Sequence, residues 1–159
     1  MGFDLNGLKP NAEIGIYFRN NAWWWRPLAS YVLSICDDIF LEGETDYWQS
    51  NDGQKVSAGT ANKIAERLNN FIELGKVKRY TEKYENERKA FPQKVCQLCE
   101  GTGDRKDLEP PEWKAHCNGC NACLGTGKVD DTSALYPFSE ENVKEFAKFC
   151  ETSGGFEIC

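Results

Sequence analysis

The sequence predicts a small, mainly α-helical protein of about four helices, with a cysteine-rich β-hairpin module inserted between the third and fourth helix. Three observations support this fold class. Apolar residues recur at three- and four-residue steps in several segments, which is the period of a helix that buries one face. Two Cys-x-x-Cys pairs lie near one another in the second half of the chain. With 40% hydrophobic residues and 5 tryptophans, the chain has the apolar surface that a core requires.

The first two helices are predicted near residues 27–41 and 58–74. Residues 2–21 mix glycine, asparagine and short apolar pieces, which indicates an irregular or strand-like entry. Pro27 suits a first helical turn. Ser57 or Thr60 is a plausible cap of the second helix, and Gly75 is a plausible stop. The apolar faces of the two helices consist of Leu28, Tyr31, Val32, Ile35, Cys36 and Ile39, and of Ala61, Ile64, Ala65, Leu68, Phe71 and Ile72.

A third, highly charged helix is predicted near residues 76–91, and a fourth helix follows the module. The fourth helix begins at Ser139, which two glutamates follow, and ends before Gly154. The tail 156–159 alternates apolar and polar residues and suggests a short strand or an apolar plug. The chain then divides into a helical domain at 1–92, a module at 93–130, and a C-terminal part at 131–159 that packs back on the helical domain.

Charge and hydropathy limit the possible partners and locations. A net charge of -6 opposes a diffuse attraction to nucleic acid, so binding of that kind would need a local basic face. Residues 76–94 provide one, with Lys78, Arg79 and Lys83 as its candidate contacts. We expect a cytoplasmic protein without membrane contact, because no secretory signal is evident and no apolar stretch reaches the ~18 residues needed to span a bilayer.

The cysteine-rich module contains the same Cys-x-x-Cys-x-Gly-x-Gly pattern twice, at 96–103 and at 120–127. Two paired half-sites of this spacing are typical of one tetrahedral zinc site. The glycines permit positive φ and let backbone N–H groups approach the thiolates. The sequence therefore predicts one structural Zn²⁺, with the ligands Cys96, Cys99, Cys120 and Cys123.

Two alternatives concern this site. An iron–sulfur cluster also uses four thiolates. Cys117 forms a Cys-x-x-Cys with Cys120, so the second pair could be shifted by three residues, with Cys117 or His116 as the alternative ligand. The symmetry of the glycines favours Cys120 with Cys123. Among the other cysteines, Cys36 and Cys150 lie on predicted apolar helix faces and are expected in the core.

The doubled motif resembles the cysteine-rich zinc domain of the DnaJ (Hsp40) co-chaperones, over about residues 96–127 only. DnaJ proteins carry four such motifs, whereas this chain has two, and it lacks the His-Pro-Asp signature of the J-domain. The resemblance therefore implies a zinc-stapled hairpin and no co-chaperone role. The remainder, including residues 20–28 and 154–159, looks like uncharacterised small proteins of phages and bacterial mobile elements.

An aromatic run, Trp23, Trp24 and Trp25 beside Arg26, is the most unusual stretch outside the cysteines. It is interpreted either as a hydrophobic lid at the start of a helix or as an aromatic platform for a partner. No set of residues typical of an enzyme is evident. The leading hypothesis is a non-enzymatic zinc protein that binds another protein, as a phage-encoded regulator or inhibitor of a host system would. Nucleic-acid binding is the first alternative, and a thiol redox protein using Cys117 with Cys120 or Cys123 is the second.

Overall fold

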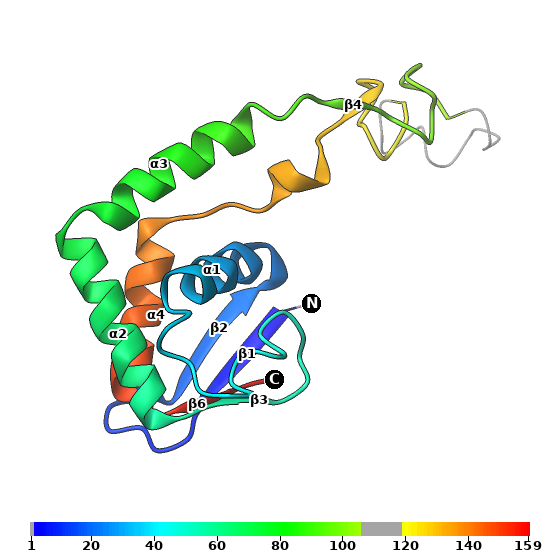
Figure 1. The fold of residues 1–159 in the computed structure, drawn as a ribbon. Coiled ribbons are helices and arrows are strands. Elements are labelled where there is room, and N and C mark those ends of the chain that lie inside the picture. The colour runs from blue at the N-terminus through cyan, green and yellow to red at the C-terminus, as the bar shows by residue number, and fades with distance from the viewer. Residues whose placement is uncertain (1, 106–118) are drawn as a thin grey trace. The chain divides into compact units, whose positions relative to one another are not determined.

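The computed structural model divides the chain into two compact units (Figure 1). Residues 2–105 and 119–159 are described. The first unit, which we call the body, contains Met1–Asn86 and Tyr136–Cys159, and the second, which we call the cysteine module, contains Glu87–Leu135.

A four-stranded antiparallel sheet forms one layer of the body. The strands are β1 (Gly2–Gly7), β2 (Tyr17–Asn21), β3 (Gln54–Val56) and β6 (Phe156–Ile158), in the order β2-β1-β6-β3. Alternate side chains are buried on one face, and the described part of the other face is exposed or half-buried. The C-terminal strand therefore lies inside the sheet, where Phe156 pairs with Gly7 of β1 and with Val56 of β3.

Helix α1 spans Ala22–Ile35, so it begins five residues before the predicted start and ends six residues before the predicted end. The prediction took Pro27 as the first turn, but the cap is Asn21. Its side chain accepts hydrogen bonds from the backbone N–H groups of Trp23 and Trp24. Pro27 lies inside the helix, at the cost of one helical hydrogen bond.

The other three helices lie close to their predicted positions. Helix α2 spans Ala58–Glu73 with Ser57 as its cap, α3 spans Lys76–Lys89, and α4 spans Glu140–Thr152 with Ser139 as its cap. A short 3₁₀ helix, η1 (Glu13–Gly15), lies between β1 and β2. Helices α1, α2 and α4 lie on one side of the sheet (Figure 1), and they bury their apolar faces against it.

The layer between the helices and the sheet is rich in aromatic side chains. Phe146 of α4 lies at its centre, with ring centroids 5.4 to 6.3 Å from those of five neighbouring rings. Those rings belong to Phe18, Trp25, Trp48, Phe149 and Phe156. Cys36 and Cys150 are both buried, as predicted from their positions on apolar helix faces. The body is thus held together by a conventional hydrophobic core.

The buried carboxylate of Glu44 holds the connection between α1 and β3 in place through hydrogen bonds. The sequence did not indicate this role. Glu44 accepts hydrogen bonds from the backbone N–H groups of Leu41 and Ser57 and from the hydroxyl of Thr60. Burial acts to raise the pKa of Glu44, but these donors outweigh it and hold the pKa below its usual value. The carboxylate therefore joins this connection to the N-terminus of α2, where the helix dipole favours a negative charge.

The cysteine module has little regular structure. Its strands β4 (Lys94–Val95) and β5 (Lys128–Val129) form a two-stranded antiparallel sheet, and a short 3₁₀ helix, η2 (Thr132–Leu135), follows. The buried cluster of its described part consists of four cysteines, with half-buried Val129 packed against them. This unit therefore has no apolar core of the kind found in the body.

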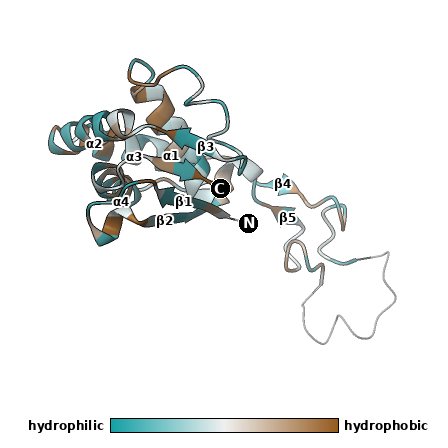
Figure 2. Ribbon diagram, turned by 90° about the horizontal axis from the view of Figure 1, so that it is seen from below, coloured by the Kyte–Doolittle hydropathy of each residue, from teal (hydrophilic) through white to brown (hydrophobic). Residues whose placement is uncertain are grey.

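The predicted fold class is correct in part. Four α-helices and a short antiparallel hairpin are present among the described residues, but the four-stranded sheet gives the body a mixed α and β architecture. Figure 2 shows that α2 and α4 carry both hydrophilic and hydrophobic residues, as helices that bury one face do. In the described part of the chain, no helix has the length and apolar character needed to span a membrane.

Candidate metal centre

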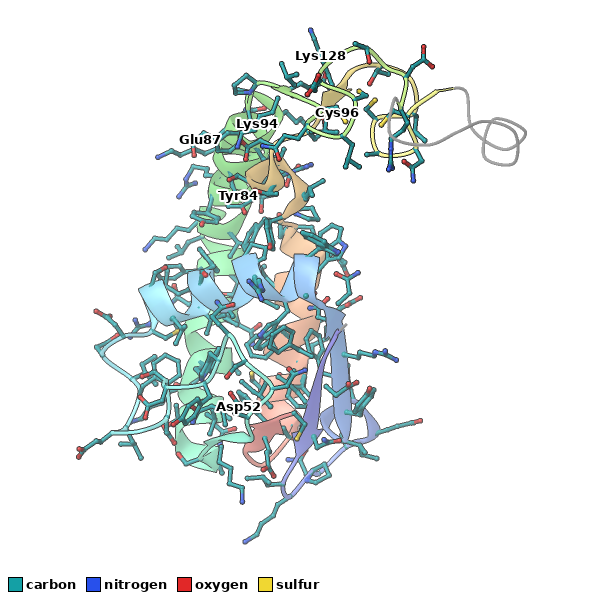
Figure 3. The ribbon with its side chains drawn as sticks, turned by 90° about the vertical axis from the view of Figure 1, so that its right-hand side faces the viewer. Asp52, Tyr84, Glu87, Lys94, Cys96 and Lys128 are labelled. Atoms are coloured by element: carbon teal, nitrogen blue, oxygen red, sulfur yellow. The ribbon has the colours of Figure 1, made fainter. Side chains whose placement is uncertain are left out.

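Four buried thiols meet in the cysteine module. The sulfur atoms of Cys96, Cys99, Cys120 and Cys123 all lie within 4.8 Å of one another. The Sγ atoms of Cys96 and Cys120 are 3.8 Å apart, and those of Cys99 and Cys123 are 3.7 Å apart. Figure 3 shows the sulfur atoms gathered beside Cys96. This group could hold a metal ion.

The sulfur separations fit a single tetrahedral ion. Four ligands about 2.3 Å from a central zinc ion lie roughly 3.8 Å from each other. A disulfide, by contrast, needs two sulfurs about 2.05 Å apart, and these four cysteines are free. The geometry is thus that of a metal-binding set rather than of two disulfides.

The two half-sites have nearly the same local geometry, 24 residues apart. In each, the backbone N–H of the last glycine donates to the second thiol: Gly103 to Cys99 at 3.3 Å and Gly127 to Cys123 at 3.2 Å. The threonine hydroxyl of each half donates to the carbonyl of the same cysteine, from Thr102 at 2.6 Å and from Thr126 at 2.7 Å. The predicted approach of glycine N–H groups to the thiols is therefore confirmed.

The glycines also let the two half-sites touch through their backbones. A Cβ on Gly103 would lie 2.4 Å from the carbonyl oxygen of Gly125, and one on Gly127 would lie 2.2 Å from that of Gly101. All four have φ between 73° and 83°. A side chain at Gly103 or Gly127 would clash with the backbone of the other half-site, and all four positions have a φ that favours glycine, so the Gly-x-Gly of each motif lets the site close. The sequence did not reveal this mutual contact.

The protonation of the thiols depends on the same contacts. Burial raises the pKa of Cys96 to about 11. Burial acts in the same direction on Cys123, but the N–H of Gly127 and the thiols of Cys99 and Cys120 lower its pKa to about 7. Four neighbouring buried thiols cannot all be ionised at neutral pH without a cation, because their charges repel each other. A bound cation would supply that compensation.

Polar contacts hold the two chain segments together where they enter and leave the site. Lys94 Nζ lies 2.6 Å from a carboxylate oxygen of Asp131, and Gln93 donates to Asp130 at 2.9 Å. Arg88 donates to the carbonyl of Ala134 at 2.5 Å. These contacts align the β4 and β5 strands, from which the first and second half-sites extend.

The other candidate partner-binding residues differ in their exposure to solvent. Trp25 is fully buried, and its indole N–H donates to the carbonyl of Trp48 at 2.7 Å, so it is not available to a partner. Trp24 is half-buried, whereas Trp23 is 45% exposed and packs against Tyr136. The run is therefore a lid over the core at one end and an exposed aromatic residue at the other. Four basic candidates are exposed on α1 and α3: Arg26, Lys78, Arg79 and Lys83.

The question of register is answered in part. Cys123 belongs to the four-thiol group, as the symmetric register of the glycines requires. The alternative ligands His116 and Cys117 lie outside the described residues, and Cys117 is also one member of the expected redox pair.

Comparisons with protein-family models, with curated proteins and with solved structures each find no match.

Proposed function

We propose that this chain is a non-enzymatic protein with one structural Zn²⁺, and that it acts by binding another protein. The observation that carries the proposal is the buried set of four thiols at the separation of tetrahedral ligands. Each cysteine is between 0% and 5% exposed. A catalytic zinc ion keeps an open position for water or substrate, whereas four thiolates that enclose an ion are typical of structural sites.

Zinc is favoured over an iron–sulfur cluster by the compactness of the group. A four-iron cluster places each thiolate on a different iron, so the sulfurs must surround the whole cluster rather than one ion. Four sulfurs within 4.8 Å of one another suit one ion. The likeness of the doubled motif to the DnaJ zinc domain supports the same metal.

Metal analysis of purified protein tests this part of the proposal. We expect one zinc and no iron per chain by inductively coupled plasma mass spectrometry. Cys123→Ser should lose most of the zinc, because a tetrahedral site needs all four ligands. Cys117→Ser and Cys159→Ser serve as matched controls and should keep it. Iron in place of zinc, or loss of zinc from Cys117→Ser alone, would contradict the proposal.

Binding of a protein is supported by the apolar residues that the cysteine module exposes. Leu124 is 73% exposed and has a φ of 51°, a region that costs a non-glycine residue roughly 1–2 kcal/mol. The matching residue of the first half-site is Glu100, with a φ of 53°. Since a glutamate suits the same backbone position, neither packing nor backbone geometry explains the leucine. Leu124, with Val95 and Leu98 at 62% and 53% exposed, gives the module several exposed apolar residues that a partner protein would cover.

A capture experiment tests the binding role. The zinc-loaded chain should retain a specific protein from a lysate of its host cells, and Leu124→Glu should lose it while keeping its zinc. Nuclease treatment should not release that protein. A regulator or inhibitor of a host system, the role expected from the resemblance to small phage proteins, predicts that the retained protein is a host protein. If the wild type and Leu124→Glu retain the same amount of that protein, Leu124 no longer supports the proposed binding of a protein.

Nucleic-acid binding is the second candidate, and the exposed basic residues of α3 favour it. Lys78, Arg79 and Lys83 lie within two turns of one another on that helix. Such binding must weaken with salt, since it releases counterions from phosphates. Affinity for DNA or RNA at low ionic strength, lost on reversal of these three charges, would favour this candidate over the first.

A further inference from the structure

The pairing of β4 with β5 determines which backbone groups of the hairpin point outward. Hydrogen-bonded and non-hydrogen-bonded residue pairs alternate along two antiparallel strands. The N–H of Cys96 donates to the carbonyl of Gly127 at 2.9 Å, next to the Val95 and Lys128 pair. Val95 and Lys128 are therefore the non-hydrogen-bonded pair, and each directs its N–H and C=O away from the other strand.

The two outer edges of the hairpin differ. At the β5 edge, the hydroxyl of Thr126 accepts from the N–H of Lys128 at 3.3 Å. Its single proton is shared between the carbonyls of Cys123 at 2.7 Å and Lys128 at 2.9 Å. The hydroxyl therefore satisfies the N–H of Lys128 and lies against its carbonyl. At the β4 edge, the N–H and C=O of Val95 have no hydrogen-bond partner among the described residues. Among the described residues, a side chain therefore covers the β5 edge, and none covers the β4 edge, which is open to a further strand.

An apolar groove lies beside the open edge. It has a volume of about 280 Å³, and its apolar lining includes the side chains of Val95, Leu98, Ala122 and Val129. Val95 is 62% exposed and Leu98 is 53% exposed. An apolar side chain that entered this groove would cover both.

The charged groups at the groove are already engaged. Lys94 is paired with Asp131, and Asp130 accepts from Gln93. A charged ligand side chain would lose its hydration without gaining a free partner from these groups, whereas an apolar one loses nothing. The lining therefore selects an uncharged, apolar occupant.

We propose that the β4 edge at Val95 is a docking site for an extended segment of a partner protein, which adds as a third strand and places an apolar side chain in the Val95 and Leu98 groove. Backbone hydrogen bonds to the open edge provide the alignment, and the groove provides the preference for an apolar residue. The inference rests on the proposed protein-binding function and specifies its site and the kind of segment bound.

A displayed library of random heptapeptides, selected on the zinc-loaded full chain, tests the site. We expect the enriched peptides to lack proline and to alternate apolar with other residues, as an added strand does. A synthetic copy of one enriched peptide should bind about tenfold more weakly when the amides that face Val95 are N-methylated, since a backbone hydrogen bond is lost. N-methylation at the intervening amides is the matched control and should have little effect.

Variants of the protein give an independent measure. Val95→Pro removes the outward N–H and no hydrogen bond of the hairpin, so the zinc content should stay at that of the wild type while peptide affinity falls about tenfold. Val95→Thr keeps the N–H and should bind. Leu98→Ala should also weaken binding without loss of zinc, because the matching position of the second half-site is already Ala122.

The outcomes separate this inference from the proposed function. No enrichment, or affinity unchanged by Val95→Pro and by N-methylation, overturns the docking site. If a captured partner binds Val95→Pro as well as it binds the wild type, the protein-binding function stands and this site is wrong. If the chain forms dimers that Val95→Pro abolishes, the occupant is a second copy, and the proposal of a different partner is overturned. Loss of zinc from the wild type or absence of any partner contradicts the function itself.

Discussion

The body and the cysteine module use different means to hold a chain in place. The body buries a layer of large side chains between three helices and a sheet, with Phe146 in contact with five other rings. In the described part of the module, the buried cluster is four cysteines. The body gains stability from removing apolar surface from water, whereas the module has little such surface to remove.

This difference indicates that the two units have separate sources of stability. A unit without an apolar core needs a disulfide, a metal or a partner to remain ordered. The module has free cysteines at metal-binding distances. We therefore expect the order of the module to depend on a bound ion and the order of the body to be independent of it. The following experiments test that separation, starting with the largest expected effect.

Removal of the metal should have the largest effect and should be confined to the module. Structural zinc sites contribute roughly 10–16 kcal/mol of apparent binding free energy, far more than the module can obtain from apolar burial. In hydrogen exchange with and without a strong chelator, we expect amides of 94–103 and 120–129 to lose protection while those of α2 and α4 keep theirs. Loss of protection throughout the chain would show that the two units are coupled.

Truncation of Phe146, the central ring of the body, should destabilise the body and leave the cysteine module unchanged. Phe146→Ala should lower the free energy of unfolding of the body by about 3–5 kcal/mol, because it removes contacts with five rings and leaves a cavity. Urea unfolding followed by tryptophan fluorescence measures the change, and Phe146→Leu should give a smaller one. Zinc content should stay at one per chain in folded protein. A variant that loses zinc while its body remains folded would contradict the independence of the module.

A methyl group added at one glycine of the module should weaken the site. Gly127→Ala places a Cβ 2.2 Å from the carbonyl of Gly101, at a φ of 73°. We expect zinc affinity to fall about 10- to 100-fold, the range seen when groups around metal ligands are changed. Competition with a chromogenic chelator measures it.

The matched control for Gly127→Ala is Gly59→Ala in α2. There the added Cβ meets nothing within 4 Å. Alanine should stabilise the helix by about 0.5–1 kcal/mol and leave zinc affinity unchanged. Equal effects of the two substitutions on zinc affinity would show that the contact between half-sites is unimportant.

The buried carboxylate of Glu44 gives the body a pH dependence of its own. Because its pKa is held below the usual value, its contribution to stability is present above the ordinary glutamate pKa of about 4.3 and is lost as the pH falls through the lower value. Glu44→Gln should cost about 1–2 kcal/mol at neutral pH, since one amide oxygen replaces two carboxylate oxygens that accept three hydrogen bonds.

The pH profile of Glu44→Gln provides the check. Its urea midpoint should vary less with pH below neutral than that of the wild type. A pH profile equal to that of the wild type would mean that Glu44 is not ionised in the body.

Much of the fold could be predicted from local signals, because those signals act through neighbouring residues. Ser57 and Ser139 cap α2 and α4 as expected, since a cap requires only a side chain and the N–H groups that follow it. The start of α1 differs from the prediction because Asn21 and Pro27 are competing start signals, and the side chain of Asn21 caps the helix while Pro27 lies within it. The sequence indicates strand-like segments at 2–21 and 156–159, where β1, β2 and β6 lie, but not β3 or the pairing of the four strands into one sheet, because three of the strands have only three to five residues and their partners are distant along the chain.

The candidate metal site likewise could be predicted where it depends on residues close together in the sequence. The spacing of Cys96, Cys99, Cys120 and Cys123 indicated the four ligands, because a Cys-x-x-Cys turn is local and its repetition is visible in the sequence. The contact of each Gly-x-Gly with the other half-site joins residues 24 positions apart, and no local pattern reveals it. The closed edge at Lys128 and the open edge at Val95 likewise became visible only when the strands were paired.

The sequence by itself determined the four thiols and the caps of two helices, since these depend on residues within a few positions of one another. The tertiary structure decided that Trp25 is buried while Trp23 is exposed, that the C-terminal strand lies inside the sheet, and that Val95 lies at an open edge. The physical reason is that burial and strand pairing depend on partners distant along the chain, and the identity of those partners becomes fixed only when the chain is folded.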